Sequence, residues 1–443
     1  MKPFLIFVAF AASALPTTVM AQAAATQMNE SLTLERLEQL AVENNPTVRA
    51  AQAAVDAARG RASQAAVWPN PVVGYTGEEI TTRGSNDPRG EHGFFVEQMI
   101  PLGGKLRLGR SVFDRAADEA AIRADLQRQR IVSSVRALFY QVLTTERRIE
   151  VHERLAALGS EATGVTAQLF NVGAADRPDF LESEIETRRV QLELNAARNQ
   201  AFALREQLAA VVGAPDAARR PLAGSIDQAI PELERDATLQ ALIERSPQVR
   251  AALATIARTQ ARTALARRET YPDVFMRAGA AYNREHGEDT RRPIGWEGQL
   301  EAGVSIPLFN RNQGGIAAAR AEETAAQAEL TRLQLALRAQ AASEFATYLT
   351  AIRSAESFRA DILPRAEQAY TLYLARYREM SAAYPQVLVA QRGLFEMARE
   401  YLGHLEDAWR SALRLQGLLA GDGLDAPDGD GQAIEASTRI GRE

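Results

Sequence analysis

The sequence predicts a mostly helical chain with a small β part, built from one module that occurs twice. Three observations lead to this prediction. Short motifs of the first half recur in the same order in the second half, side chains near Trp296 alternate between apolar and polar, and no proline interrupts the stretch from Lys105 to Asn171. A helix of that length, at about 1.5 Å per residue, would reach roughly 100 Å, which no globular core requires.

The two halves correspond through four motifs whose spacing increases slowly along the chain. The offset between matching positions is 201, 203, 206 and then 207 residues, as small loop insertions would produce. We therefore predict a first repeat over 22–224 and a second over 225–420, followed by a flexible acidic tail over 421–443. The matching segments are 45–51 and 246–252, Trp68-Pro69-Asn70 and Tyr271-Pro272-Asp273, Ile100-Pro101-Leu102 and Ile306-Pro307-Leu308, and Phe170, Pro178 and Leu181 with Tyr377, Pro385 and Leu388.

The N-terminus has the pattern of a cleaved signal peptide. Lys2 precedes an apolar run from Phe4 to Leu15, and Val19-Met20-Ala21 is typical of a signal-peptidase site, so residues 1–21 are expected to be removed. The run is short for a membrane-anchoring helix, and no later segment offers about 18 consecutive apolar residues. The chain has no cysteine, which excludes disulfides and a lipid anchor on an N-terminal cysteine, and its net charge of −5 does not indicate a nucleic-acid partner.

Each half is predicted to contain a helix, a β-hairpin, a long helix and a return helix. Ser31 or Thr33 would cap the first helix, which runs towards Val67, and the proline after Trp68 would end it. Pro364 should kink the long helix of the second half. The predicted ranges are about 72–100, 105–171 and 178–213 for the hairpin, long helix and return helix of the first half, and about 236–268, 274–306, 310–379 and 385–420 for the four elements of the second half.

The clearest strand covers residues 296–306, where one face is apolar and the other polar. Its length suits a tilted strand that crosses a bilayer. Four strands with open edges are not tolerated in hydrocarbon, whereas three chains would supply twelve strands, enough for a closed barrel with an aqueous lumen. We therefore expect a homotrimer in lipid, with Glu297, Gln299 and Glu301 as lumen-lining candidates and Trp296 at the membrane interface.

Three segments resemble those of a known family. They are Glu97 to Lys105, Ser305 to Asn310, and Leu363 to Ala369, and together with the duplicated layout they are similar to the TolC-like outer-membrane efflux proteins. The resemblance covers essentially the whole mature chain, and the first segment is most similar to the CzcC-like branch, the outer subunits of heavy-metal pumps. Many relatives have a lipidated N-terminal cysteine, which this chain lacks.

The resemblance implies a trimeric, twelve-stranded β-barrel in the outer membrane, continued by a long periplasmic α-helical barrel. It also implies a passive duct that receives its substrate from an inner-membrane resistance-nodulation-division (RND) pump through a periplasmic adaptor. For the CzcC-like branch, the substrate would be divalent cations such as cobalt, zinc and cadmium. No reaction and no cofactor are implied. A multidrug or type I secretion duct remains an alternative, as does a periplasmic coiled-coil scaffold that forms no channel.

The turns between the long and return helices are the candidate periplasmic gate. Asp176 and Asp179 flank Pro178, so a trimer would bring six carboxylates near one constriction, which would favour cations. Ordinary turn and capping chemistry is the favoured alternative for Asp176. Arg177 and Arg378 could pair with carboxylates and hold the gate closed. In the barrel, Glu297 and Glu301 could bias the lumen towards cations or simply wet the pore wall.

Metal ligation and catalysis find no support in the sequence. None of the four histidines stands at metal-ligand spacing, and the seven methionines form no cluster. The sequence also has no G-x-S-x-G hydrolase motif and neither of the nucleotide-binding motifs G-x-x-x-x-G-K-[ST] and G-x-G-x-x-G. We therefore expect neither a metal site nor an enzyme. The histidines are His92, His152, His286 and His404.

Overall fold

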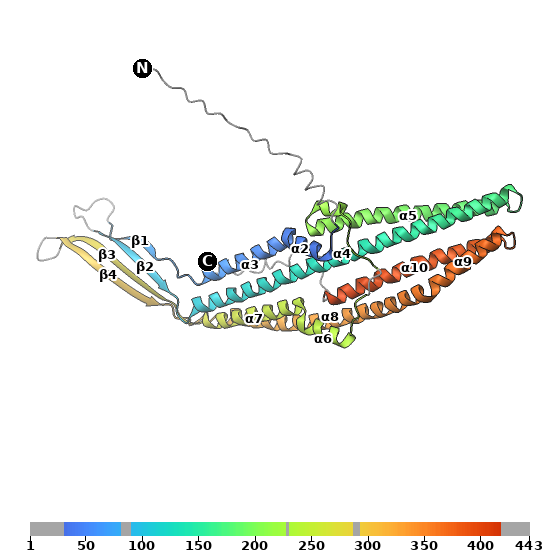
Figure 1. Cartoon of the computed structure of the whole chain (residues 1–443). Coiled ribbons are helices and arrows are strands. Elements are labelled where there is room, and N and C mark those ends of the chain that lie inside the picture. Colours follow the sequence, from blue (N-terminus) through green and yellow to red (C-terminus); the bar gives the residue numbers. More distant parts are fainter. Residues whose placement is uncertain (1–30, 81–89, 227–229, 287–292, 418–443) are drawn as a thin grey trace, which may run out of the picture. The chain divides into compact units, whose positions relative to one another are not determined.

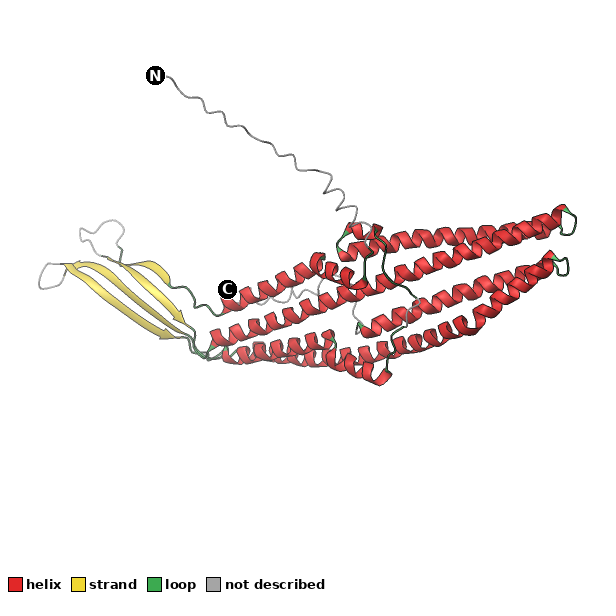
Figure 2. Ribbon diagram, viewed as in Figure 1, coloured by secondary structure: helices red, strands yellow, loops and turns green. Residues whose placement is uncertain are grey.

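The computed structural model describes residues 31–80, 90–226, 230–286 and 293–417. These residues are mostly helical and include one antiparallel sheet (Figures 1 and 2). They form two compact units, and each unit contains segments from both sequence repeats. The predicted signal peptide, most of the two hairpin loops and the acidic tail lie outside the described residues.

The first unit, which we call the sheet unit, covers the described residues within 47–129 and 234–342. Its four strands lie in the order β1-β2-β3-β4, so the two predicted hairpins pair with each other through β2 and β3. Ile100 of β2 is opposite Val274 of β3, which in turn is opposite Val304 of β4. The strands are β1 (Val72–Glu78), β2 (Glu91–Ile100), β3 (Val274–His286) and β4 (Pro293–Val304).

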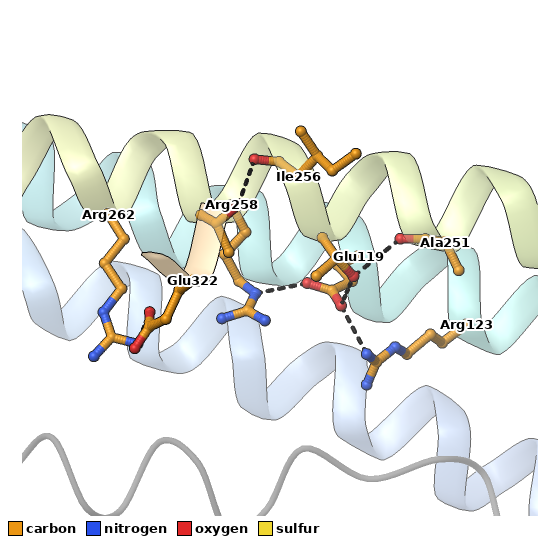
Figure 3. Close-up of polar contacts among 9 residues, drawn as sticks. Glu119, Arg123, Ala251, Ile256, Arg258, Arg262 and Glu322 are labelled. Carbon is orange, nitrogen blue, oxygen red and sulfur yellow. Dashed lines mark hydrogen bonds and ion pairs between the residues drawn. The ribbon is translucent and has the colours of Figure 1, made fainter. Parts of the chain in front are cut away.

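A buried carboxylate joins two helices of the sheet unit, α4 (Lys105–Asn171) and α7 (Pro247–Arg268). Glu119 of α4 is only 2% exposed. It accepts hydrogen bonds from Arg123 and from Arg258, both at 2.7 Å (Figure 3). The Thr255 hydroxyl also donates to it, at 2.6 Å. Since a buried charge is costly without partners, these three donors are what allow a carboxylate to lie between the helices.

The second unit, the hairpin unit, covers the described residues within 31–46, 130–233 and 343–417. It contains α2 (Leu34–Asn44), α5 (Arg177–Val212) and α10 (Tyr384–Gln416), with residues 130–171 of α4 and with α9 (Leu363–Arg378). Its apolar core lies among α4, α5, α9 and α10 and includes Leu155, Val190, Tyr370 and Leu394. The two helical turns, α4–α5 and α9–α10, both belong to this unit.

The prediction of a single first helix in each half is wrong. Asn45 separates α2 from α3 (Pro46–Ala65), and Ser246 separates α6 (Arg235–Arg245) from α7. Asn45 has an extended backbone, with ψ of 125°, and its amide donates to the Val211 carbonyl at 2.8 Å. The physical reason is the proline that follows each of these residues, because it disfavours the helical conformation of the preceding residue and suits the first turn of a new helix.

The long helix of the second half has three parts. It runs as α8 (Gln313–Ser357), a π-helical turn (Phe358–Ile362) and α9. Pro364 has no N–H and its ring clashes with the carbonyl four residues earlier, which explains why the ladder widens just before it. The Leu363 N–H accordingly donates to the Phe358 carbonyl, five residues back. Within the described residues, no helix combines the length and the hydropathy that a membrane span requires.

Candidate functional site

One face of the sheet is apolar over all four strands. The register aligns alternate residues of each strand on this face, and most of them are large and exposed. Leu300 and Trp296 of β4 keep 78% and 73% of their surface exposed. A soluble chain rarely exposes such a continuous apolar area, so this face requires lipid or a partner. The large apolar members of the face are Val73, Tyr75, Phe94, Val96, Ile100, Val274, Met276, Tyr282, Trp296, Leu300 and Val304.

The opposite face is polar and has Arg277 near its centre. Arg277 of β3 is opposite Glu97 of β2 and Glu301 of β4, so the three side chains form one row across three strands. The guanidinium donates twice to Glu97, at 2.9 and 2.6 Å, and once to Glu301 at 3.4 Å. It also lies 4.5 Å from the centroid of the Phe95 ring, within the range of a cation–π contact.

The three lumen-lining candidates of the sequence all lie on this polar face. Glu297 and Glu301 are opposite Ala281 and Arg277, while Gln299 donates to Glu91 at 3.0 Å. Trp296 lies on the apolar face, with its ring edge-on to Tyr282 at 5.7 Å. Their roles in a pore or at a membrane interface stay predictions.

Sequence reasoning missed Arg277 as a central residue. The signal was present, because Arg277 and Arg284 are the only arginines in the four described strands. The cross-strand register, however, is not visible in a single strand, and it alone brings Glu97 and Glu301 to the same guanidinium.

At the α4–α5 turn, Asp176 is the N-cap of α5. Its carboxylate accepts from the Asp179 backbone N–H at 3.0 Å, which satisfies one of the free donors at the helix start. Burial raises the pKa of Asp179, and the nearby carboxylates of Asp176 and Glu182 raise it further. The equivalent N-cap of α10 is Ala383, which has no side-chain hydrogen bond. A carboxylate ring at this turn remains a prediction.

The two arginines predicted to hold the turns closed differ in their contacts. Arg378 of α9 forms an ion pair with Glu161 of α4, and not with either aspartate of the α4–α5 turn. Arg177 is exposed and forms no ion pair with any residue in the described part of the chain. A second link joins the hairpins, where Arg392 of α10 donates at 2.6 Å to the buried carboxylate of Glu186 in α5.

Tyrosines fill the core beside these ion pairs. Burial raises the pKa of Tyr370 to about 12, and its hydroxyl donates to the Leu158 carbonyl at 3.1 Å. The Tyr384 hydroxyl is buried and forms no hydrogen bond with the described residues. In the same described ranges, no group of three His, Asp or Glu side chains is arranged to hold a metal ion.

A sheet with one apolar and one charged face, joined to long helical hairpins, defines the class of outer-membrane channel proteins. Comparison with known families gives the assignment directly. The chain belongs to the outer membrane efflux protein family, whose model matches residues 37–214 and 238–421. It is therefore an outer-membrane efflux channel protein related to TolC.

Three similar proteins illustrate the assignment. The chain is 26% identical to the cobalt-zinc-cadmium resistance protein CzcC of Cupriavidus metallidurans, over 88% of this chain and 90% of CzcC. It is 27% identical to the nickel-cobalt-cadmium resistance protein NccC of Alcaligenes xylosoxydans xylosoxydans, over 68% of this chain and 67% of NccC. A crystal structure of CusC has the same fold, with a TM-score of 0.75 at 14% identity, covering 89% of this chain and 93% of CusC.

Proposed function

We propose that this chain forms a homotrimeric duct that exports divalent heavy-metal cations across the outer membrane, after export of the chain itself by a cleaved signal peptide and without lipidation. In this role it is the outer subunit of a tripartite system with a periplasmic adaptor and an inner-membrane RND pump. The duct is passive and carries out no reaction. The observation that carries the proposal is a four-stranded sheet with an exposed apolar face and two open edges.

The open edges are the reason for a trimer. β1 and β4 each have one neighbouring strand in the sheet, and the other side of each strand presents backbone groups that hydrocarbon cannot satisfy. Joining β4 of one copy to β1 of the next removes both edges. Three copies then supply twelve strands, a barrel wide enough for a water-filled lumen, with the apolar face towards lipid and the Arg277 face towards water.

Helix α5 provides evidence for assembly with a second copy of the chain, and this evidence is independent of the sheet. It buries Val190, Leu194, Ala197 and Ala201 against its own chain. On the opposite side of the helix, an apolar stripe remains exposed, although helices normally bury their apolar side chains on one face. A neighbouring copy would cover this stripe. The stripe consists of Leu181, Ile185, Leu192 and Phe202.

The cargo and the partners are inferred from relatives. Two similar proteins, CzcC and NccC, are named for resistance to divalent metals, which supports a metal cargo over a drug or a secreted protein. The polar sheet face supports it as well, because it has more carboxylates than basic groups in the described strands. A duct of this kind should bind its cargo weakly, since a tight site would slow the flow.

Disulfide cross-linking between strand edges tests the proposal. The natural chain has no cysteine, so only introduced pairs can react. We would combine Tyr75→Cys in β1 with a cysteine at Gly298, Leu300 or Ala302 in β4, because all four positions lie on the apolar face. At least one pair should give an oxidation ladder that ends at three chains in outer-membrane fractions.

The single-cysteine variants are the controls and should give no ladder. If every pair stays monomeric although the protein reaches the outer membrane, the edges do not meet and the trimeric barrel is wrong. Deletion of the gene should also increase the sensitivity of the cell to cobalt, zinc or cadmium. A change in drug sensitivity alone would favour the multidrug alternative.

A further inference from the structure

We propose that Arg277 determines the ion selectivity of the channel by neutralising the carboxylates at the centre of the sheet's polar face. This inference rests on the proposed function, because it takes the polar face as the wall of the lumen.

The geometry places one positive charge between two negative ones. The guanidinium of Arg277 contacts Glu97 on one side and Glu301 on the other, within a single row of the sheet. Phe95 lies against the same guanidinium and limits its freedom to move away from the wall.

Carboxylates elsewhere on the same face have no such partner. Glu91 accepts a hydrogen bond from the neutral amide of Gln299, and Glu297 is opposite Ala281. Neither forms an ion pair with a basic side chain in the described part of the strands. Arg277 is thus the residue that limits the net negative charge of the wall, and the charge of a pore wall sets which ions concentrate near it.

A purely structural role for Arg277 makes a different prediction. Its hydrogen bonds to Glu97 and Glu301 could serve only to hold the strands together. In that case Arg277→Lys and Arg277→Gln should have the same effect on the channel, because both remove the two hydrogen bonds that the guanidinium donates to Glu97. If its charge matters for transport, Arg277→Lys should behave like the natural protein and Arg277→Gln should not, because lysine keeps the charge but not the planar fork.

The test is the reversal potential of the purified trimer in planar bilayers under a dilute KCl gradient. We expect Arg277→Gln to raise the ratio of K⁺ to Cl⁻ permeability by about fourfold, because one unit charge at roughly 10 Å in water changes the local concentration of each ion about twofold, in opposite directions for K⁺ and Cl⁻. Arg277→Lys should leave the ratio near that of the natural protein. Glu301→Gln should lower it, because the arginine then faces one carboxylate less.

The matched control is Arg332→Gln, which removes an exposed arginine of helix α8 that pairs with Glu329 three residues away. It should not change the ratio. If the Arg277→Gln channel conducts with the same ratio of K⁺ to Cl⁻ permeability as the natural protein, this inference is wrong, although the proposed duct still stands. If Arg277→Gln fails to assemble, an unchanged ratio in Glu301→Gln leads to the same conclusion. A natural protein that does not conduct at all would instead contradict the proposed function.

Discussion

Replacing Glu119 by Gln should strongly destabilise the sheet unit. The carboxylate is 2% exposed and accepts three hydrogen bonds, two of them from guanidinium groups. The substitution keeps the size of the side chain but removes the negative charge that Arg123 and Arg258 contact. Removing one partner of a buried ion pair generally costs about 3–5 kcal/mol, because the remaining charge stays in a poorly solvated site.

The neighbouring residue Asp118 provides a matched control. Its side chain is 62% exposed and pairs with Arg115 at 3.2 Å on the surface of the same helix. Exposed pairs of this kind contribute about 0–1 kcal/mol, so Asp118→Asn should be nearly neutral. Both changes remove one negative charge from α4, and only the burial of the carboxylate differs.

The assay is urea unfolding of the detergent-solubilised protein, followed by the loss of helical circular dichroism. Glu119→Gln should move the unfolding midpoint to clearly lower urea, while Asp118→Asn should leave it within error of the natural protein. Equal midpoints for the two variants would refute the reasoning, since they would show that the contacts of Glu119 do not stabilise the packing of α4 on α7.

Three further predictions concern other parts of the chain. Asp176→Ala removes the N-cap of α5 and should cost about 1 kcal/mol in urea unfolding, whereas an unchanged midpoint would argue against the cap. Burial lowers the pKa of His152, so the unfolded state binds the proton more readily and the stability of the folded protein should fall as pH drops through 6.5. His152→Gln should weaken this pH dependence of the melting temperature, and a variant with the same pH dependence as the natural protein would contradict the prediction. Leu300→Arg on the apolar face should lower the stability of the protein in lipid by about 2–4 kcal/mol and reduce its amount in outer-membrane fractions. An unchanged amount in these fractions would show that the face does not contact lipid.

The ends of the longest helix could be predicted from the sequence because the chemistry is local. Gly103 and Gly104 lie directly before Lys105, and Gly173 lies two residues after Asn171. All three glycines adopt positive φ angles, which do not continue a right-handed helix. Pro364 could likewise be recognised as a site of distortion. The breaks at Asn45 and Ser246 are likewise encoded locally, by the prolines that follow these two residues.

The ion pairs could not be predicted, because they depend on distances that one strand or one helix does not define. Arg378 lies near the end of α9, and its partner Glu161 lies well inside α4, so no sequence spacing links them. In the sheet, the strand periodicity gave the polar face of β4 correctly, but only the pairing of β2 with β3 brings Glu97 to Arg277.

The number of chains in the membrane-extracted particle is the most direct test of the account. Native mass spectrometry of the mature protein in detergent should show three copies, because only a closed ring satisfies the backbone of β1 and β4 in lipid. A particle that contains a single copy, with its four strands intact and inserted in the membrane, would contradict the central claim.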